Sequence, residues 1–101
     1  MILYNVTCNI PHEIEQEWVE WMKNEHIPEV MASELFHSHK MFKLLSEVEG
    51  NEGINYAIQY FCETMEHYEQ YSSLHGPALK AKTYAKYGEN VLAFRTLLEQ
   101  V

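Results

Sequence analysis

NEHIPEVM, residues 24–31, is the stretch of sequence from which the predicted architecture follows. It ends a pattern typical of an amphipathic helix and places a proline two residues after a histidine, where helical hydrogen bonding is disturbed. A second copy of its core, HGPAL at residues 75–79, occurs 49 residues later. Because a strand-like run stands before and after each copy, the sequence predicts two similar strand–helix–strand halves with His26 and His75 in matching positions.

Four strand patterns surround these two stretches. Residues 2–10 alternate between two sets of side chains, and residues 54–62 alternate most clearly, with tyrosines on one side. Residues 36–48 and 91–99 are rich in strand-forming residues. Between the second and third runs, EGNEG at residues 49–53 predicts a reversing turn.

Helical patterns fill the two remaining intervals. From residue 11 to residue 22 the apolar side chains share a single helix face. Pro28 predicts a kink or break near His26, followed by a short helical piece. The second helix is expected to begin after Thr64, a good capping residue, and to end at Gly88.

The order strand, helix, strand, strand, helix, strand is that of an α+β ferredoxin-like βαββαβ sandwich. Right-handed crossovers give a four-stranded antiparallel sheet of order 4-1-3-2 with both helices on one face. The other face carries an apolar patch, which we assign to Leu3, Phe61, Val91 and Leu97. Such a patch does not stay in water, so we expect a partner to cover it.

The composition limits the classes of partner. The 101 residues provide for one domain, residues 1–101, with a formal net charge of −8. That charge repels nucleic-acid phosphates and anionic membranes, so neither is an expected partner. The sequence shows no leader-like segment and no membrane-spanning run, which predicts a cytoplasmic location. Cys8 and Cys62 match no disulfide or redox pattern and are predicted to be buried free thiols.

Four segments resemble a known family. They are WVEWM (18–22), HIPEVM (26–31), YAIQY (56–60) and AFRTLLE (93–99). Together they resemble, over nearly the whole chain, a family of bacterial proteins of similar length catalogued as a domain of unknown function. That family is similar in turn to the dimeric α+β barrel superfamily, in which two ferredoxin-like protomers stack sheet against sheet.

The resemblance implies a homodimer formed through the sheet face and a small-molecule pocket between helices and sheet in each protomer. It does not imply a reaction, because the superfamily includes cofactor-free monooxygenases, isomerases, dehydratases and haem-degrading enzymes. Whether the protein is an enzyme therefore stays open at this point.

His26 is the candidate catalytic residue. Beside Trp18, Trp21 and Met22 and just before a helix-disturbing proline, it can point a titratable ring into an apolar cavity and act as a general acid or base. Alternatively, it only caps carbonyls exposed at a helix break. His75 has the same two interpretations. Tyr60 belongs to a row of tyrosines that either hydrogen-bonds a ligand or forms plain core.

Asn5, Gln59 and Arg95 form a second set of candidates. We expect them near the middle of three adjacent strands, in one polar row on the face opposite the tyrosines. A buried guanidinium requires an anion, which can be a partner's glutamate or a substrate carboxylate, unless bulk water reaches it. The row is therefore interpreted as polar groups of a dimer interface or, if its face lies under the helices, as ligand-binding groups of the pocket.

No metal or cofactor is expected. His37 and His39 lie on one side of a strand but lack a recognisable third ligand. Haem-degrading relatives pair a strand asparagine with a tryptophan and a helix histidine, and Asn5 and His75 resemble two of these, whereas the tryptophan has no match.

The sequence thus leads to two main hypotheses. In the first, a cytoplasmic homodimer binds or converts a small aromatic or carboxylated metabolite without a metal. In the second, the protein is a non-enzymatic dimeric regulatory or assembly protein. A haem-binding monooxygenase-like protein is a further alternative.

Overall fold

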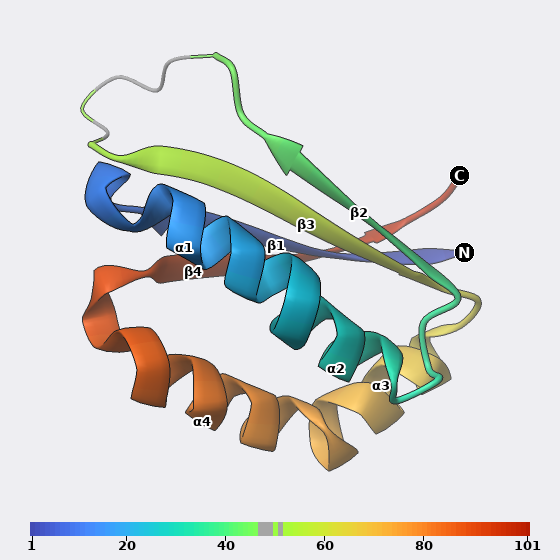
Figure 1. Cartoon of the computed structure of the whole chain (residues 1–101). Coiled ribbons are helices and arrows are strands. Elements are labelled where there is room, and N and C mark those ends of the chain that lie inside the picture. Colours follow the sequence, from blue (N-terminus) through green and yellow to red (C-terminus); the bar gives the residue numbers. More distant parts are fainter. Residues whose placement is uncertain (47–49, 51) are drawn as a thin grey trace.

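The computed structural model describes residues 1–46, 50 and 52–101, and shows a four-stranded antiparallel sheet with helices on one face (Figure 1). The strands are β1 (Ile2–Ile10), β2 (Ser38–Lys43), β3 (Ile54–Cys62) and β4 (Leu92–Glu99). Their order is β2-β3-β1-β4, and every neighbouring pair is antiparallel. This confirms the predicted 4-1-3-2 sheet of a ferredoxin-like α+β fold.

Two helical segments cover the same face of the sheet (Figure 1). The first comprises a 3₁₀ turn η1 (His12–Ile14), α1 (Glu15–Trp21), a π-helical turn η2 (Met22–His26) and α2 (Ile27–Met31). The second comprises α3 (Met65–Leu74), α4 (Gly76–Tyr87) and a 3₁₀ turn η3 (Gly88–Asn90). None of the helices in the described part of the chain has the length and apolar character needed to cross a membrane.

The π-helical turn η2 corrects the expected break before Pro28. The helical backbone continues through this region, and the amide N–H of Ile27 bonds to the carbonyl of Met22, five residues earlier. A π turn is wider than an α turn by one residue. The widening lies next to the position at which proline offers no N–H donor, so the helix accommodates Pro28 without ending.

The π turn also shifts which side chains face the sheet. The buried residues of this segment are Trp18, Met22, Ile27 and Val30. In a regular helix, His26 would occupy the position four residues after Met22 and face the core. The inserted residue places Ile27 there instead, and His26 lies half-buried at the edge of the interface.

Even-numbered residues of β1 and β3 face the helices and form the core. Trp18 is 1% exposed and packs on Tyr56, with ring centroids 5.2 Å apart. A second aromatic group surrounds Tyr4, whose ring lies 5.1 Å from Tyr68 and 6.0 Å from Tyr60. Cys8 and Cys62 are buried free thiols, as predicted.

The register of β4 contradicts the predicted polar row. Asn5 pairs with Gln59 on the face away from the helices, which we call the open face. Arg95, however, pairs with Val6, whose side chain lies on the helix side of the sheet. Because directly opposed residues share a face, Arg95 points toward the helices and the three residues do not form one row.

The same register corrects the apolar patch of the open face. Val91 and Leu97 belong to the helix side, whereas Leu3 and Phe61 lie on the open face as predicted. The open-face patch is formed by Leu3, Phe42, Phe61, Leu92, Phe94 and Leu98. Lys40 is the one charged residue among the described strand positions on this face, so the face is nearly uncharged.

Several boundaries agree with the sequence. The Thr64 side chain accepts a hydrogen bond from the N–H of His67 at 3.4 Å and caps α3. Gly88, with a φ of +58°, ends α4. The strand expected within residues 36–48 is confined to β2. The turn predicted at residues 49–53 lies partly outside the described residues.

Gly53 approaches the β1 backbone so closely that a side chain is expected to destabilise the fold. Its φ is +86°, and a Cβ placed there would lie 2.5 Å from the carbonyl oxygen of Ile10. Left-handed strain and overpacking together predict that Gly53→Ala lowers the free energy of unfolding by about 3 kcal/mol. Urea denaturation measures this loss. Gly50→Ala is the control: its φ is +75° with no atom within 4 Å, so about 1 kcal/mol is expected. Equal losses would contradict the steric argument.

Candidate functional site

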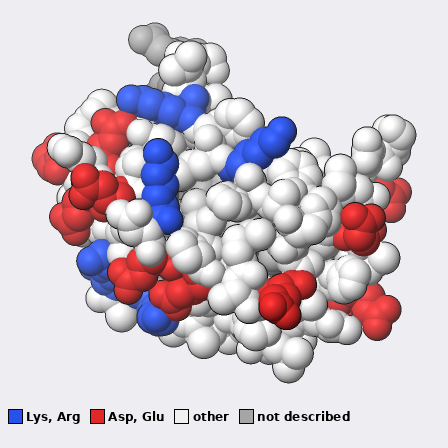
Figure 2. Space-filling model, turned by 45° about the vertical axis from the view of Figure 1, so that its right-hand side comes forward, with Lys and Arg blue, Asp and Glu red and all other residues white. Residues whose placement is uncertain are grey.

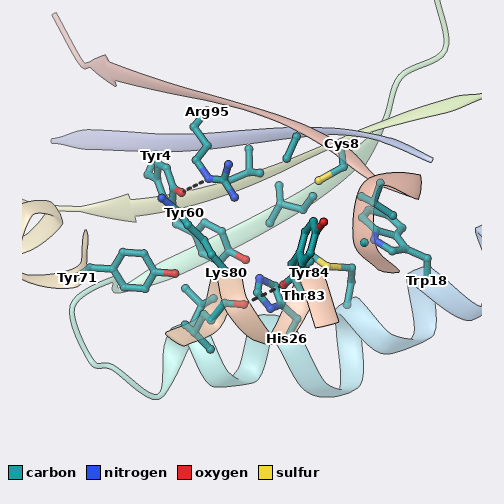
Figure 3. A pocket seen from close by; sticks show the side chains of 18 residues that line it. Tyr4, Cys8, Trp18, His26, Tyr60, Tyr71, Lys80, Thr83, Tyr84 and Arg95 are labelled. Atoms are coloured by element: carbon teal, nitrogen blue, oxygen red, sulfur yellow. Dashed lines mark hydrogen bonds between the residues drawn. The ribbon is translucent and has the colours of Figure 1, made fainter. Parts of the chain in front are cut away.

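A cavity of about 330 Å³ lies between the helices and the sheet (Figure 3). Its apolar wall includes Val6, Ile58 and Ala93 from the strands and Trp18, Met22 and Leu79 from the helices. The volume falls at the lower end of the range for ligand sites, and a mostly apolar wall with a few convergent polar groups is typical of such sites. The cavity is therefore suited to a small organic molecule.

The polar groups of this cavity are hydroxyls and nitrogen bases. They are Tyr4, Tyr60, Tyr71, Tyr84, Thr83, His26, Lys80 and Arg95. No aspartate or glutamate occurs among the described residues that line it. In a chain with 15 acidic residues, a lining that carries cations and no carboxylate favours an anionic occupant.

Arg95 enters the cavity from the edge strand β4. Its Nε donates a hydrogen bond to the hydroxyl oxygen of Tyr4 at 3.1 Å (Figure 3). Burial raises the pKa of Tyr4, although the Arg95 guanidinium opposes this rise, and so the hydroxyl is neutral at pH 7. The ion pairs formed by the described residues do not include Arg95, which is accessible to solvent. Its remaining N–H groups are therefore available to a carboxylate.

His26 is the last residue of the π turn, and its ring points into the cavity (Figure 3). The imidazole stacks on Trp21 with ring centroids 5.0 Å apart, and no described residue hydrogen-bonds it. Burial lowers the pKa of His26; the Glu29 carboxylate opposes this, and Arg95 adds to it. The ring is thus neutral near pH 7. Capping of carbonyls at a helix break finds no support, because the helix continues.

The buried hydroxyls and the thiol of the cavity are neutral hydrogen-bonding groups rather than nucleophiles. Burial raises the pKa of Tyr60 and of Tyr71 above the ordinary value, and it raises the pKa of Cys8 to about 11. Phenols and thiols react as nucleophiles only when ionised. His26 is consequently the lining group whose side-chain type is best suited to transfer a proton near neutrality.

The structure brings together only some of the residues predicted from the sequence. His26, Tyr60 and Arg95 line the cavity. Trp21 does not; it borders a groove on the outer side of the helices and supports the His26 ring. His75 joins α3 to α4, with its ring 6.3 Å from that of Tyr71 and outside the cavity lining.

Asn5 and Gln59 lie on the open face, away from the cavity. The Asn5 side-chain amide donates a hydrogen bond to the hydroxyl of Thr7 at 3.0 Å. Because His75 belongs to the helix layer on the other side of the sheet, Asn5 and His75 do not meet. The pair of residues that resembles a haem site is therefore not assembled in this fold.

Of the two tryptophans beside His26, sequence reasoning selected Trp21 for ligand binding, whereas the structure places Trp18 in the cavity lining and Trp21 in the groove on the outer side of the helices. Thr83 was missed although it stands four residues after Leu79 and four before Tyr87, both buried. Residues at this spacing share one side of a helix, so the hydroxyl of Thr83 lies on the sheet-facing side of α4.

The surface charge is distributed without a basic patch on the face drawn in Figure 2. Acidic side chains lie toward both sides of this face, and the basic ones lie toward its left and upper parts, several of them beside acidic ones (Figure 2). Between them lies a broad area without charged side chains. This arrangement agrees with the net charge of −8.

Fold and cavity together define the class: a ferredoxin-like α+β domain with a small-molecule-sized cavity between helices and sheet. The chain belongs to the family described as a domain of unknown function, DUF4286, whose model matches residues 1–101. A comparison with curated proteins gives no significant match.

Solved structures with the same fold cover nearly the whole chain. An EthD-family protein from Bacillus halodurans is 16% identical, with a TM-score of 0.68 and coverage of 100% of both chains. A dimeric ferredoxin-like protein from an uncultured marine organism is 11% identical, with a TM-score of 0.64 and coverage of 99% of this chain and 97% of that one. Hydroxynitrile lyase from Passiflora edulis is 16% identical, with a TM-score of 0.51 and coverage of 99% and 95%. At these identities the likeness concerns the fold alone.

Proposed function

We propose that the protein binds a small carboxylate with an aromatic or other apolar body in the cavity between helices and sheet. The observation that carries this proposal is an arginine without a carboxylate partner in a cavity lined by no described carboxylate. A guanidinium binds a carboxylate through two parallel N–H···O bonds, which give both affinity and orientation. The chain's own side chains provide every contact this binding needs.

The ligand's orientation follows from the distribution of polar and apolar groups. Its carboxylate contacts Arg95, which the hydroxyl of Tyr4 holds in position through the 3.1 Å hydrogen bond. Its apolar body packs against the wall that includes Trp18 and Ile58. If the ligand is converted as well as bound, His26 is the group placed to take or give a proton.

Arg95→Gln tests the proposal. Hydrogen bonds to charged groups contribute about 1.5–3 kcal/mol, so the substitution is expected to weaken binding of benzoate, the probe ligand, about tenfold to a hundredfold. Wild-type protein should show a melting temperature that rises with benzoate concentration, and isothermal titration calorimetry gives the affinities.

The matched control is Lys23→Gln, which removes the same charge from an exposed residue that lines neither the cavity nor the groove on the outer side of the helices. This variant should bind benzoate as the wild type does. Equal affinities of the wild type and Arg95→Gln, or no response of the wild type to benzoate, phenylacetate or acetate at millimolar concentration, would refute the proposed site.

The protein is also proposed to act as a homodimer formed by two open faces. Support comes from the open-face patch, where Phe94 is 69% exposed, and from the near absence of charge among the described residues around it. In an acidic chain, a face without carboxylates is one on which two copies can meet without repulsion. Asn5 and Gln59 would then lie in the interface as hydrogen-bonding groups, the first of the two roles predicted for them.

A non-enzymatic regulatory or assembly protein is the alternative. The open face favours it, because this surface would form a dimer whether or not the cavity binds a ligand. The two functions separate experimentally: the alternative predicts a stable dimer in which no carboxylate raises the melting temperature.

A further inference from the structure

A groove of about 370 Å³ lies on the outer side of the helices, behind the wall of the cavity. It runs between the first helical segment and α4, and its lining includes Trp21, Glu25, His26, Glu29, Lys82 and Lys86. His26 belongs both to this lining and to that of the cavity. One imidazole therefore stands in the wall that separates the ligand cavity from a hollow open to solvent.

The charges on the two sides of this wall differ. On the groove side, Glu25 and Glu29 come from the histidine's own helical segment, and Lys82 and Lys86 come from α4. Lys82 Nζ pairs with a Glu29 carboxylate oxygen at 2.7 Å. On the cavity side stand Arg95 from β4, Lys80 and the hydroxyls of the tyrosines, with no described carboxylate. The cavity side therefore lacks the anion that a protonated imidazole would face.

A carboxylate ligand would supply that anion. In the empty cavity His26 is neutral, because burial lowers its pKa and the Arg95 cation adds to this. A bound carboxylate offsets the field of Arg95 and attracts an imidazolium within the same 330 Å³ space. The cationic ring would then face the ligand on one side and the carboxylates of the groove on the other.

We propose that the cavity takes up its carboxylate ligand together with one proton, which His26 receives from solvent through the groove. This inference rests on the proposed carboxylate site. It adds that the anion and one proton bind together, so that the net charge of the protein does not change on binding. Trp21, stacked on the ring at 5.0 Å, is the positioning residue that keeps the imidazole in the wall. His26 itself contacts both the ligand and the groove.

The pH dependence follows from linkage. Burial lowers the pKa of His26 in the ligand-free protein, and the proposed carboxylate would raise that pKa in the complex. Affinity is therefore greatest below the free-state pKa and falls as pH rises toward the bound-state pKa. Within that window the dissociation constant of benzoate increases by at most about tenfold per pH unit.

Isothermal titration calorimetry of the full chain with benzoate tests this coupling. Titrations in phosphate and in Tris, whose ionisation enthalpies differ, give the number of protons exchanged. Between about pH 5 and 8 we expect the uptake to rise to about one proton within the window. His26→Gln should bind benzoate with no uptake, and His12→Gln, which removes an exposed histidine, should retain it.

Each outcome decides between the two proposals. Benzoate binding that depends on Arg95 but exchanges no proton at any pH overturns the inference and leaves the proposed function intact. Absence of benzoate binding in wild type removes both. If His26→Gln does not fold, an NMR titration of the His26 ring in wild-type protein replaces it. A midpoint that moves to higher pH with benzoate supports the coupling, and an unchanged midpoint overturns it.

Discussion

Phe94→Glu is expected to convert the proposed dimer to a folded monomer. Phe94 pairs with Thr7 within the open face and is 69% exposed in the single chain. In a symmetric dimer the substitution would place two unpaired carboxylates in an apolar interface. Such burial costs several kcal/mol, which lowers the dimer affinity at least about a hundredfold. Sedimentation velocity measures the change, and circular dichroism checks that the fold is retained.

Leu74→Glu is the matched control for this substitution. Leu74 is 72% exposed at the end of α3, on the helix side of the sheet, so the same chemical change there should leave the dimer intact. A wild-type protein that sediments as a monomer in dilute solution would contradict the proposed dimer. Dissociation by both variants alike would mean that added charge, rather than the open face, controls association.

The sequence predicts most of the fold because alternation is strong in two of its strands, β1 and β3, and helical spacing is clear in both helical segments. In β3, buried positions from Ile54 to Cys62 alternate with half-buried ones without exception. A strand with so regular a period-two pattern admits one assignment of its faces. Turn and cap residues such as Thr64 and Gly88 then fix the helix ends.

The faces of β4 could not be predicted for a physical reason. Residues 91–99 carry large apolar side chains at both odd and even positions, so alternation does not distinguish the two sides. The pairing of β1 with β3 joins even to even residues, whereas that of β1 with β4 joins even to odd. A register difference of one residue moves every side chain to the other face, and this is why Arg95 was expected beside Asn5.

The geometry of the site also depends on the π turn before Pro28, which the sequence does not predict. Pro28 marks where the helix must adjust, but the chain can respond with a kink, an end or a π turn. The π turn chosen here moves Ile27 into the core and leaves His26 in the wall of the cavity. The neighbouring residues in the sequence therefore identify His26 as a candidate. That its ring lines both the cavity and the groove follows only from the three-dimensional structure.

Ala93→Phe is expected to abolish benzoate binding while leaving the protein folded. Ala93 pairs with Cys8 on the helix side of the sheet and lines the cavity, so a phenyl ring at this position would occupy much of the 330 Å³ that the ligand needs. Filling an empty apolar space is compatible with an unchanged or higher melting temperature. Calorimetry with benzoate measures the loss of binding, and Ala81→Phe, on the exposed side of α4, is the control that should bind normally. If Ala93→Phe bound benzoate with wild-type affinity, the ligand would occupy another part of the protein, and Arg95 and His26 would lose their proposed roles together.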